Sequence, residues 1–272
     1  MRRTLFVHLA IIAAVAAGIS AGALAQAKEK AGNSITIVYN HEGTAAAELV
    51  KRGGFSAFVQ LKDRSLVFDA GGEASVILEN LHSLGFDDVE MDALVISHNH
   101  WDHVFGLPGV MSGARNNPPV FVAATARDGI KQQFPRAEVI AVGGPKKISQ
   151  GVWLTGPLEI EFLGASLSEQ ALVLEQPDGL HVVVGCSHPG IVAILERVRE
   201  MFPEGPIAFV GGGFHLGSTG KEEIQRIATE LGRLGVRKMG PSHCTGGTAV
   251  EIFRDRWGEN FVNFDLGDTY RF

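Results

Sequence analysis

Cysteine is scarce in this sequence, because its 272 residues include only two, Cys186 and Cys244. A small scaffold held together by several disulfides is therefore excluded. Each cysteine also lies close to a histidine, in "GCSH" and in "SHC", and this pairing indicates residues of a functional site. A structural disulfide between the two remains the alternative.

Long apolar runs are missing as well, except at the N-terminus. There two arginines follow the first methionine, an apolar run comes next, and small residues continue to Ala25. This order is typical of a secretory signal peptide. We expect residues 1–25 to be removed, with cleavage after Ala27 as the alternative, and the protein to be exported to the periplasm without a stable membrane association. An uncleaved membrane anchor is the competing interpretation, because the run is long.

Basic side chains are outnumbered, with 24 lysines and arginines against 30 aspartates and glutamates. Cleavage of the predicted signal peptide would leave 22 basic residues against the same 30 acidic ones. Such a surface does not suit nucleic acid or anionic lipid, whose phosphates attract a basic stripe. We therefore expect a small-molecule substrate and no nucleic-acid partner.

Residues 26–34 are polar and predicted to be flexible, and residues 35–272 are predicted to form a single domain. Apolar runs bounded by turn residues indicate strands at 35–39, 55–61, 65–70, 92–97, 120–124, 138–142, 152–155, 158–164, 170–176, 180–185, 206–212, 236–240 and 260–264. Helical spacing indicates helices at 74–85, before Phe134, at 190–202, at 218–235 and up to Trp257. The helix at 218–235 is expected to open with Thr219 and Glu222 as a capping box. This order predicts one α/β domain with two facing sheets and helices outside.

The segment "SHNHWDHVFGL" directly follows a predicted buried strand and holds three histidines and an aspartate. In an extended chain alternate side chains share a face, so His98, His100 and Asp102 would lie together and His103 would point elsewhere. Neutral imidazole and carboxylate are ligands of zinc, and they also suit iron or manganese. One loop whose side chains point in two directions could therefore bind two neighbouring metal ions.

One loop cannot complete two sites, so further ligands are expected at other strand ends. His188, His215 and His243 each follow an apolar run directly, in "GCSHPG", "GGFHL" and "PSHCTGG". His41 also follows a strand and is a weaker pocket candidate. The remaining histidines, within the signal peptide or inside predicted elements, are interpreted as ordinary ones: His8, His82 and His181.

These motifs resemble those of a known family. "HNHWDH" is similar to the His-x-His-x-Asp-His signature of the metallo-β-lactamase superfamily, and "LVFDAGG" resembles the first motif of that family. "GCSHPGI", "GGFHL" and "PSHCTGG" resemble the branch of 7,8-dihydropterin-6-methyl-4-(β-D-ribofuranosyl)aminobenzene 5′-phosphate synthases and their relatives. The resemblance implies an αββα sandwich of two mixed sheets, with Asp69 holding the metal loop by hydrogen bonds.

The same resemblance implies a ligand set. His98 and His100 would bind one ion, while Asp102, His103 and His243 would bind a second, with zinc favoured for both. Two departures stand out, because a cysteine takes the place of the bridging aspartate and no histidine occurs in the usual middle position. The resemblance makes His188 the substitute for the missing imidazole. It gives His215 no counterpart, and we treat His215 with Asp102 as catalytic candidates.

Cys186 occupies the place of the bridging aspartate, and three interpretations stay open. It can pack as a small apolar residue near the metals, bind them as a thiolate, or pair with Cys244. We rank packing slightly ahead of ligation and place the disulfide last.

We expect an exported metal-dependent hydrolase that uses a metal-bound hydroxide, with an undefined substrate. One alternative is a transferase like the synthases named above, although export argues against it because pterin precursors are made in the cytoplasm. Another is a non-catalytic metal-binding or ligand-binding protein.

Overall fold

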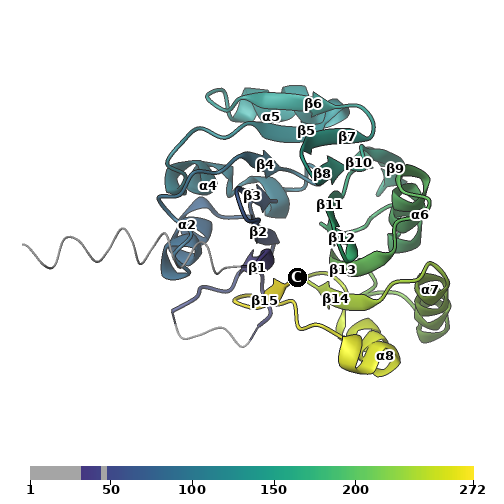
Figure 1. Ribbon diagram of the computed structural model, residues 1–272. Helices are drawn as coiled ribbons and strands as arrows, with labels where there is room; N and C mark the ends of the chain where they lie inside the picture. The colour runs from purple at the N-terminus through teal and green to yellow at the C-terminus, as the bar shows by residue number, and fades with distance from the viewer. Residues whose placement is uncertain (1–31, 44–47) are drawn as a thin grey trace, which may run out of the picture.

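The computed structural model describes residues 32–43 and 48–272, and the predicted signal peptide lies outside the described residues. Figure 1 shows two sheets packed face to face, with helices on the outer side of each. The αββα arrangement predicted from the resemblance is therefore confirmed. Among the described residues, no helix has both the length and the apolar character needed to cross a membrane.

The first sheet contains seven strands in the order β15-β1-β2-β3-β4-β5-β6. Its strands pair antiparallel from β15 to β3 and parallel from β3 to β6, so the sheet is mixed. The strands span Ser34–Tyr39 (β1), Ser56–Gln60 (β2), Ser65–Phe68 (β3), Ala93–Val95 (β4), Val120–Ala123 (β5), Val139–Val142 (β6) and Thr269–Arg271 (β15).

The second sheet contains six strands in the order β14-β13-β12-β11-β8-β7, of which β12, β13 and β14 are parallel. A separate antiparallel hairpin is formed by β9 and β10. The strands span Lys146–Ser149 (β7), Val152–Leu154 (β8), Leu158–Phe162 (β9), Ala165–Glu169 (β10), Leu172–Gln176 (β11), Gly179–Val184 (β12), Ile207–Gly213 (β13) and Lys238–Ser242 (β14).

The helices cover the outer faces of the two sheets (Figure 1). The helices beside the first sheet are α2 (Ala74–Ser83), α3 (Trp101–Val104), α4 (Leu107–Gly113), η1 (Ala124–Ala126) and α5 (Arg127–Gln133). Those beside the second sheet are α6 (Ile191–Met201), α7 (Lys221–Arg233), α8 (Gly247–Trp257) and η2 (Gly258–Asn260).

Three apolar layers hold this sandwich together. The central layer joins the inner faces of the two sheets, with Phe68 of the first and Phe209 of the second both fully buried. The two outer layers join each sheet to its helices, through residues such as Ile77 on α2 and Leu195 on α6. Because both faces of each sheet are covered, the central strands read as continuous apolar runs, which made them recognisable in the sequence.

Several local predictions need correction. Residues 260–264 form no strand, because Phe261 makes only an isolated bridge to Met239, and the terminal strand is β15 instead. The capping box is also wrong, since α7 begins at Lys221 with Gly220 as its N-cap and no side-chain cap bond. β1 begins at Ser34, the last residue of the segment that was expected to be flexible.

Candidate metal centre

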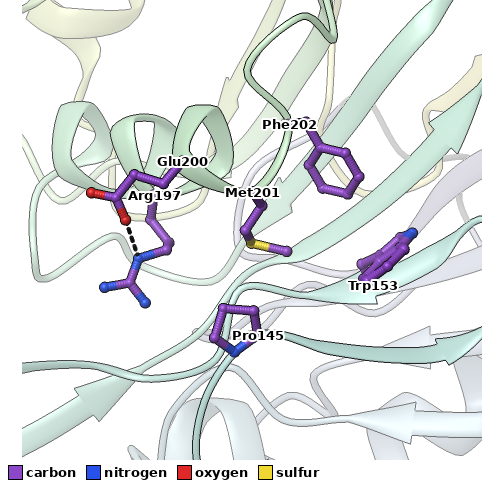
Figure 2. A pocket seen from close by; sticks show the side chains of 6 residues that line it. All are labelled: Pro145, Trp153, Arg197, Glu200, Met201 and Phe202. Atoms are coloured by element: carbon purple, nitrogen blue, oxygen red, sulfur yellow. Dashed lines mark hydrogen bonds and ion pairs between the residues drawn. The ribbon is translucent and has the colours of Figure 1, made fainter.

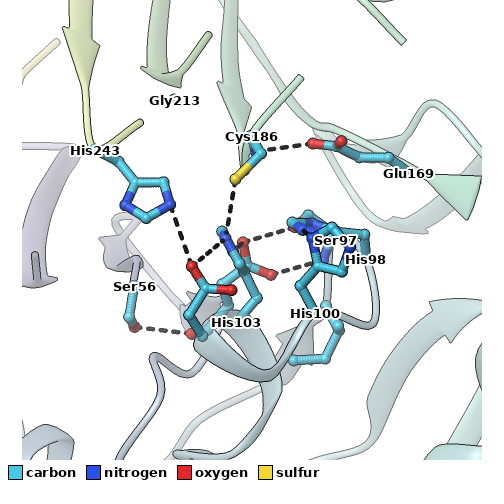
Figure 3. Close-up of polar contacts among 12 residues, drawn as sticks. Ser56, Ser97, His98, His100, His103, Glu169, Cys186, Gly213 and His243 are labelled. Atoms are coloured by element: carbon cyan, nitrogen blue, oxygen red, sulfur yellow. Dashed lines mark hydrogen bonds and ion pairs between the residues drawn. The ribbon is translucent and has the colours of Figure 1, made fainter. Parts of the chain in front are cut away.

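The predicted site residues meet where strands of both sheets end. His98 lies three residues beyond β4, Cys186 and His188 follow β12, and His215 and His243 follow β13 and β14. Figure 3 shows the side chains of His98, His100, His103, His243 and Cys186 close together, on segments from the two sheets. The carboxyl ends of neighbouring parallel strands face the same edge, so strand-end histidines far apart in sequence become neighbours.

The cluster contains a first group of three imidazoles. His98, His100 and His188 each offer a ring nitrogen, and these atoms all lie within 4.8 Å of one another. Nε2 of His98 lies 3.0 Å from Nδ1 of His100. Three imidazole nitrogens at this separation are a suitable ligand set for a divalent transition metal.

A second group adjoins the first and contains a carboxylate. Oδ2 of Asp102 lies 3.7 Å from Nε2 of His103 and 3.6 Å from Nε2 of His243. The alternation argument placed Asp102 with His98 and His100, and it is wrong because the chain turns into helix α3 immediately after His100. The family resemblance implied that Asp102, His103 and His243 belong together, and their ligand atoms lie within 4.8 Å of one another.

Cys186 lies between the two groups. Its sulfur is 3.2 Å from Nε2 of His103, and it forms candidate metal-binding groups both with His98 and His103 and with His188 and His215. Its side chain is buried, as the packing hypothesis expected, yet its sulfur faces the imidazoles. This position favours the ligand interpretation. Both cysteines are free in the structure, so the disulfide is not formed.

Asp69 orients one imidazole of the second group. Its fully buried carboxylate accepts hydrogen bonds from the backbone N–H and the hydroxyl of Ser97, each at 2.7 Å, and from Nδ1 of His103 at 2.7 Å. Burial opposes protonation of His103, but Asp69 outweighs it and raises the pKa of His103 to about 9. With Nδ1 donating to Asp69, Nε2 remains the atom that can bind a metal.

Glu169 plays the corresponding part for the first group, and the sequence analysis missed it. Its buried carboxylate accepts backbone N–H bonds from Cys186, Ser187 and His188 at 2.9, 2.7 and 2.8 Å, and a bond from Nδ1 of His188 at 2.8 Å. Burial favours the protonated carboxyl, but the bonds from His188 and the backbone lower the pKa of Glu169. A single acidic residue in the otherwise uncharged "SLSEQALVL" was the available signal.

His215 and His41 each lie beside one imidazole of the cluster. The ring of His215 lies 4.5 Å from that of His188, and the ring of His41 lies 5.9 Å from that of His243, centroid to centroid. His82 and His181 lie apart from the cluster. His82 pairs with Asp87 and His181 pairs with Asp178, as ordinary histidines do.

Backbone strain is concentrated at this site. Within residues 32–43 and 48–272, six non-glycine residues have a left-handed backbone, and four of them belong to the cluster or its supports: Asp69, Ser187, His215 and His243, with φ of 60°, 60°, 51° and 54°. Each such conformation costs on the order of 1 kcal/mol and persists only where the surroundings fix it, which is common at functional sites.

The residues fit a divalent cation. Both ring nitrogens of His243 are buried and have no hydrogen-bond partner among the described residues, which is costly unless another group satisfies them. Burial lowers the pKa of His98 and of His243 well below the ordinary value, so both are neutral and have a lone pair available. Five imidazoles, a thiol and a carboxylate around one region form a donor set for one or two metal ions.

A groove elsewhere on the molecule has none of these features. It lies between α6 and β8 and is lined by Pro145, Trp153, Arg197, Glu200, Met201 and Phe202 (Figure 2). None of the clustered histidines or cysteines contributes to it, so the metal cluster is the stronger candidate for chemistry.

Known proteins resemble this chain in sequence and in fold. A model of the metallo-beta-lactamase superfamily matches residues 49–256, and the chain therefore belongs to this superfamily. The chain is similar to the 7,8-dihydropterin-6-methyl-4-(beta-D-ribofuranosyl)-aminobenzene-5'-phosphate synthase of Methanocaldococcus jannaschii. The two are 26% identical over 249 residues, which cover 77% of this chain and 85% of the synthase. An uncharacterized protein of the same organism is 27% identical over 236 residues, covering 77% and 90% of the two chains.

Solved structures share the same fold. A metal-dependent hydrolase of the beta-lactamase superfamily superposes with a TM-score of 0.72 at 26% identity, covering 88% of this chain and 99% of the other. A diphosphatase from the PhnP family superposes with a TM-score of 0.59 at 13% identity, covering 88% and 98%, and this likeness concerns the fold alone.

Proposed function

We propose that this protein is a metal-dependent hydrolase and that its cluster holds two divalent ions, with zinc favoured and iron or manganese as alternatives. The observation that carries the proposal is the division of the ligand atoms into two adjoining groups. His98, His100 and His188 form one group, and Asp102, His103 and His243 form the other. Cys186 lies between them and would contact either ion or both.

Ions bound here would lower the pKa of a water molecule and polarise a carbonyl or phosphoryl oxygen. The protein contributes orientation. Asp69 and Glu169 fix the imidazoles of His103 and His188 through their Nδ1 atoms. Asp102 is partly exposed and can accept a hydrogen bond from water, and the exposed His215 can donate one to a leaving group.

Turnover by the metal-loaded protein tests this proposal. The chain is stripped with chelator, reloaded with zinc, manganese or iron, and assayed with 4-nitrophenyl acetate and bis(4-nitrophenyl) phosphate. We expect metal-dependent hydrolysis of at least one substrate, and its loss in His103→Ala. His82→Ala is the matched control, because His82 is an exposed histidine that pairs only with Asp87. Metal binding without turnover of either substrate would favour a non-catalytic binding protein.

A synthase-like transferase is the second candidate function. It is supported by the similarity to the Methanocaldococcus jannaschii synthase, which extends over 85% of that protein. Condensation of a dihydropterin with a ribosyl-aminobenzene phosphate by the metal-loaded chain, in the absence of ester hydrolysis, would favour it over the hydrolase.

We further propose that the protein is exported to the periplasm, with a small-molecule substrate and neither nucleic acid nor membrane as a stable partner. The support is the sequence of residues 1–25 and the acidic composition. N-terminal sequencing of the protein from its native host should begin at Gln26 or Lys28. An intact Met1 in a soluble cytoplasmic fraction would contradict export and strengthen the synthase alternative.

A further inference from the structure

The β9–β10 hairpin lies against the metal cluster and contributes no candidate ligand from its first strand. The ring of Phe162, the last residue of β9, lies 4.5 Å from that of His188, 5.6 Å from that of His100 and 5.5 Å from that of His215. Phe162 thus adjoins two of the three candidate ligands of the first group, and also the flanking His215. The hairpin is therefore continuous with the site.

The hairpin has one apolar face and one charged face. Leu158, Ile160 and Phe162 alternate with Glu159 and Glu161, and the apolar side chains are half-buried while the glutamates are exposed. Since alternate residues of a strand share a face, the half-buried apolar row lies on the side of Phe162, which faces the histidines. The side of the hairpin nearest the metal cluster is apolar and only partly covered.

The tip of the hairpin is unusual in both exposure and backbone. Phe162 pairs with Ala165, so Leu163 and Gly164 form a two-residue turn, with φ of 51° and 80°. Such a turn strongly prefers Asn-Gly, because both positions require a left-handed backbone. Here the first position holds a leucine whose exposed fraction is 92%. The leucine is unfavourable for turn stability and for solvation, so a role outside folding explains it better.

The other exposed large apolar side chains lie on the metal-binding segment. In the described part of the chain there are three such residues, Leu163, Trp101 and Phe105, and the latter two have exposed fractions of 57% and 46%. Trp101 directly follows His100 and begins α3, and Phe105, four residues on, is the C-cap residue of this helix. Leu163 and Trp101 are thus chain neighbours of Phe162 and His100, whose rings lie 5.6 Å apart. Exposed apolar side chains on both segments beside the metal cluster are consistent with a binding surface.

We propose that the β9–β10 hairpin, through Phe162 and Leu163, binds an apolar acyl or aryl group of the substrate next to the atom attacked at the metal centre. This inference rests on the proposed function, since it assigns part of the substrate of that same site. The substrate class is then an ester, amide or phosphoester in which an apolar group adjoins the reacting bond. The apolar group would cover the half-buried row on the hairpin and the leucine at its tip.

Two phosphonates that differ only in their alkyl chain test the proposal. Methylphosphonate and hexylphosphonate carry the same metal-binding anion, and their affinities for the zinc-loaded protein are measured by calorimetry. Each methylene that is buried strengthens binding about fourfold. We expect hexylphosphonate to bind the native protein about 10- to 100-fold more tightly than methylphosphonate, which corresponds to a few buried methylenes.

Three variants locate the effect. Leu163→Asn and Phe162→Ala should each reduce the preference for hexylphosphonate several-fold, while Glu159→Gln on the opposite face should keep the native ratio. Leu163→Asn suits the turn and should not lower the melting temperature, so a loss of affinity cannot come from unfolding. Zinc content is measured for Phe162→Ala, because its ring also contacts candidate ligands.

The outcomes separate this inference from the hydrolase proposal. Equal binding of the two phosphonates, or the same ratio in the native protein and both hairpin variants, overturns the apolar contact. A preserved preference without turnover of any ester or phosphodiester leaves the contact standing and removes the hydrolase. Turnover of an ester or phosphodiester with no dependence on the apolar group leaves the hydrolase proposal standing and overturns the apolar contact.

Discussion

Replacing Asp69 by asparagine should change which nitrogen carries the proton in the neutral form of His103, the form that binds a metal. The carboxylate of Asp69 accepts three hydrogen bonds, two from Ser97 and one from Nδ1 of His103. Asparagine has one accepting oxygen, and its amide group donates. If the oxygen keeps the backbone bond of Ser97, the amide faces Nδ1 of His103, which must then accept. The proton moves to Nε2, the atom that faces Asp102 and Cys186.

The loss of zinc affinity in Asp69→Asn should be large but not complete. A hydrogen bond to a charged group contributes about 1.5–3 kcal/mol. Removing a carboxylate that orients a metal-binding imidazole weakens metal binding about 10- to 100-fold, which is about 1.4–2.7 kcal/mol. These two ranges agree. We therefore expect zinc affinity to fall by about 10- to 100-fold in Asp69→Asn while the fold is kept.

Competition with a chromogenic chelator measures the affinity, and nitrogen NMR of the imidazole reports the tautomer of His103. Ser56→Ala is the matched control, because the hydroxyl of Ser56 is buried and donates to the backbone oxygen of Asp69 at 2.8 Å without touching its carboxylate. The control should bind zinc as the native protein does. Native zinc affinity in Asp69→Asn, with the proton still on Nδ1, would refute the reasoning.

The pH dependence of the metal-free protein follows from the same pair. The pKa of His103 is raised to about 9 in the folded state, above the ordinary value of about 6.5. Its protonated form therefore stabilises the fold fully below pH 6.5, and this contribution is lost as pH rises through about 9. In Asp69→Asn the fold should not lose this stabilisation as the pH rises. Urea unfolding of the metal-free protein between neutral and alkaline pH measures the difference.

Substitutions at three further positions give distinct outcomes. If the thiol of Cys186 binds metal, Cys186→Ser should weaken zinc binding strongly and Cys186→Asp should restore part of it, as chelator competition measures; full zinc content in Cys186→Ala would show that the residue only packs. Glu169→Gln should lower both zinc affinity and the free energy of unfolding, since each buried N–H left without an acceptor costs about 1–3 kcal/mol; unchanged urea midpoints would contradict this. Gly185→Ala should destabilise the metal loop, because a Cβ there would lie 2.2 Å from the hydroxyl oxygen of Ser97. Gly129→Ala, whose Cβ would meet nothing within 4 Å, is its control and should stabilise α5 by about 1 kcal/mol, so equal melting temperatures for the two variants would count against the packing argument.

The elements that the sequence predicted best are those buried on both faces. β12 and β13 are continuous apolar runs, and each was predicted within two residues of its observed limits. The N-terminal limit of α7 was misplaced because a Thr-x-x-Glu pattern two residues early resembled a capping box. The hairpin strand β10 was missed, since "ASLSE" contains a single large apolar residue, and its burial depends on the site that it adjoins.

Site residues were predictable where local order places them at strand ends. His188, His215 and His243 follow β12, β13 and β14, and these strands are parallel neighbours, so their ends meet. The position of Asp102 was not predictable from alternation, because alternation holds in an extended chain and Asp102 lies on the four-residue helix α3. Glu169 escaped notice because its partners lie 17 to 19 residues away, and no periodicity links them.

Each of the two groups of candidate ligands has a buried carboxylate that orients one of its imidazoles. Asp69, beyond the end of β3, receives Nδ1 of His103, and Glu169, on the hairpin, receives Nδ1 of His188. Each group thus has its own buried carboxylate, which leaves Nε2 of one imidazole as the atom free to bind a metal. The two carboxylates come from different parts of the fold and support different imidazoles, one in each group. This arrangement is consistent with the proposal of two adjoining ions, with Cys186 between them.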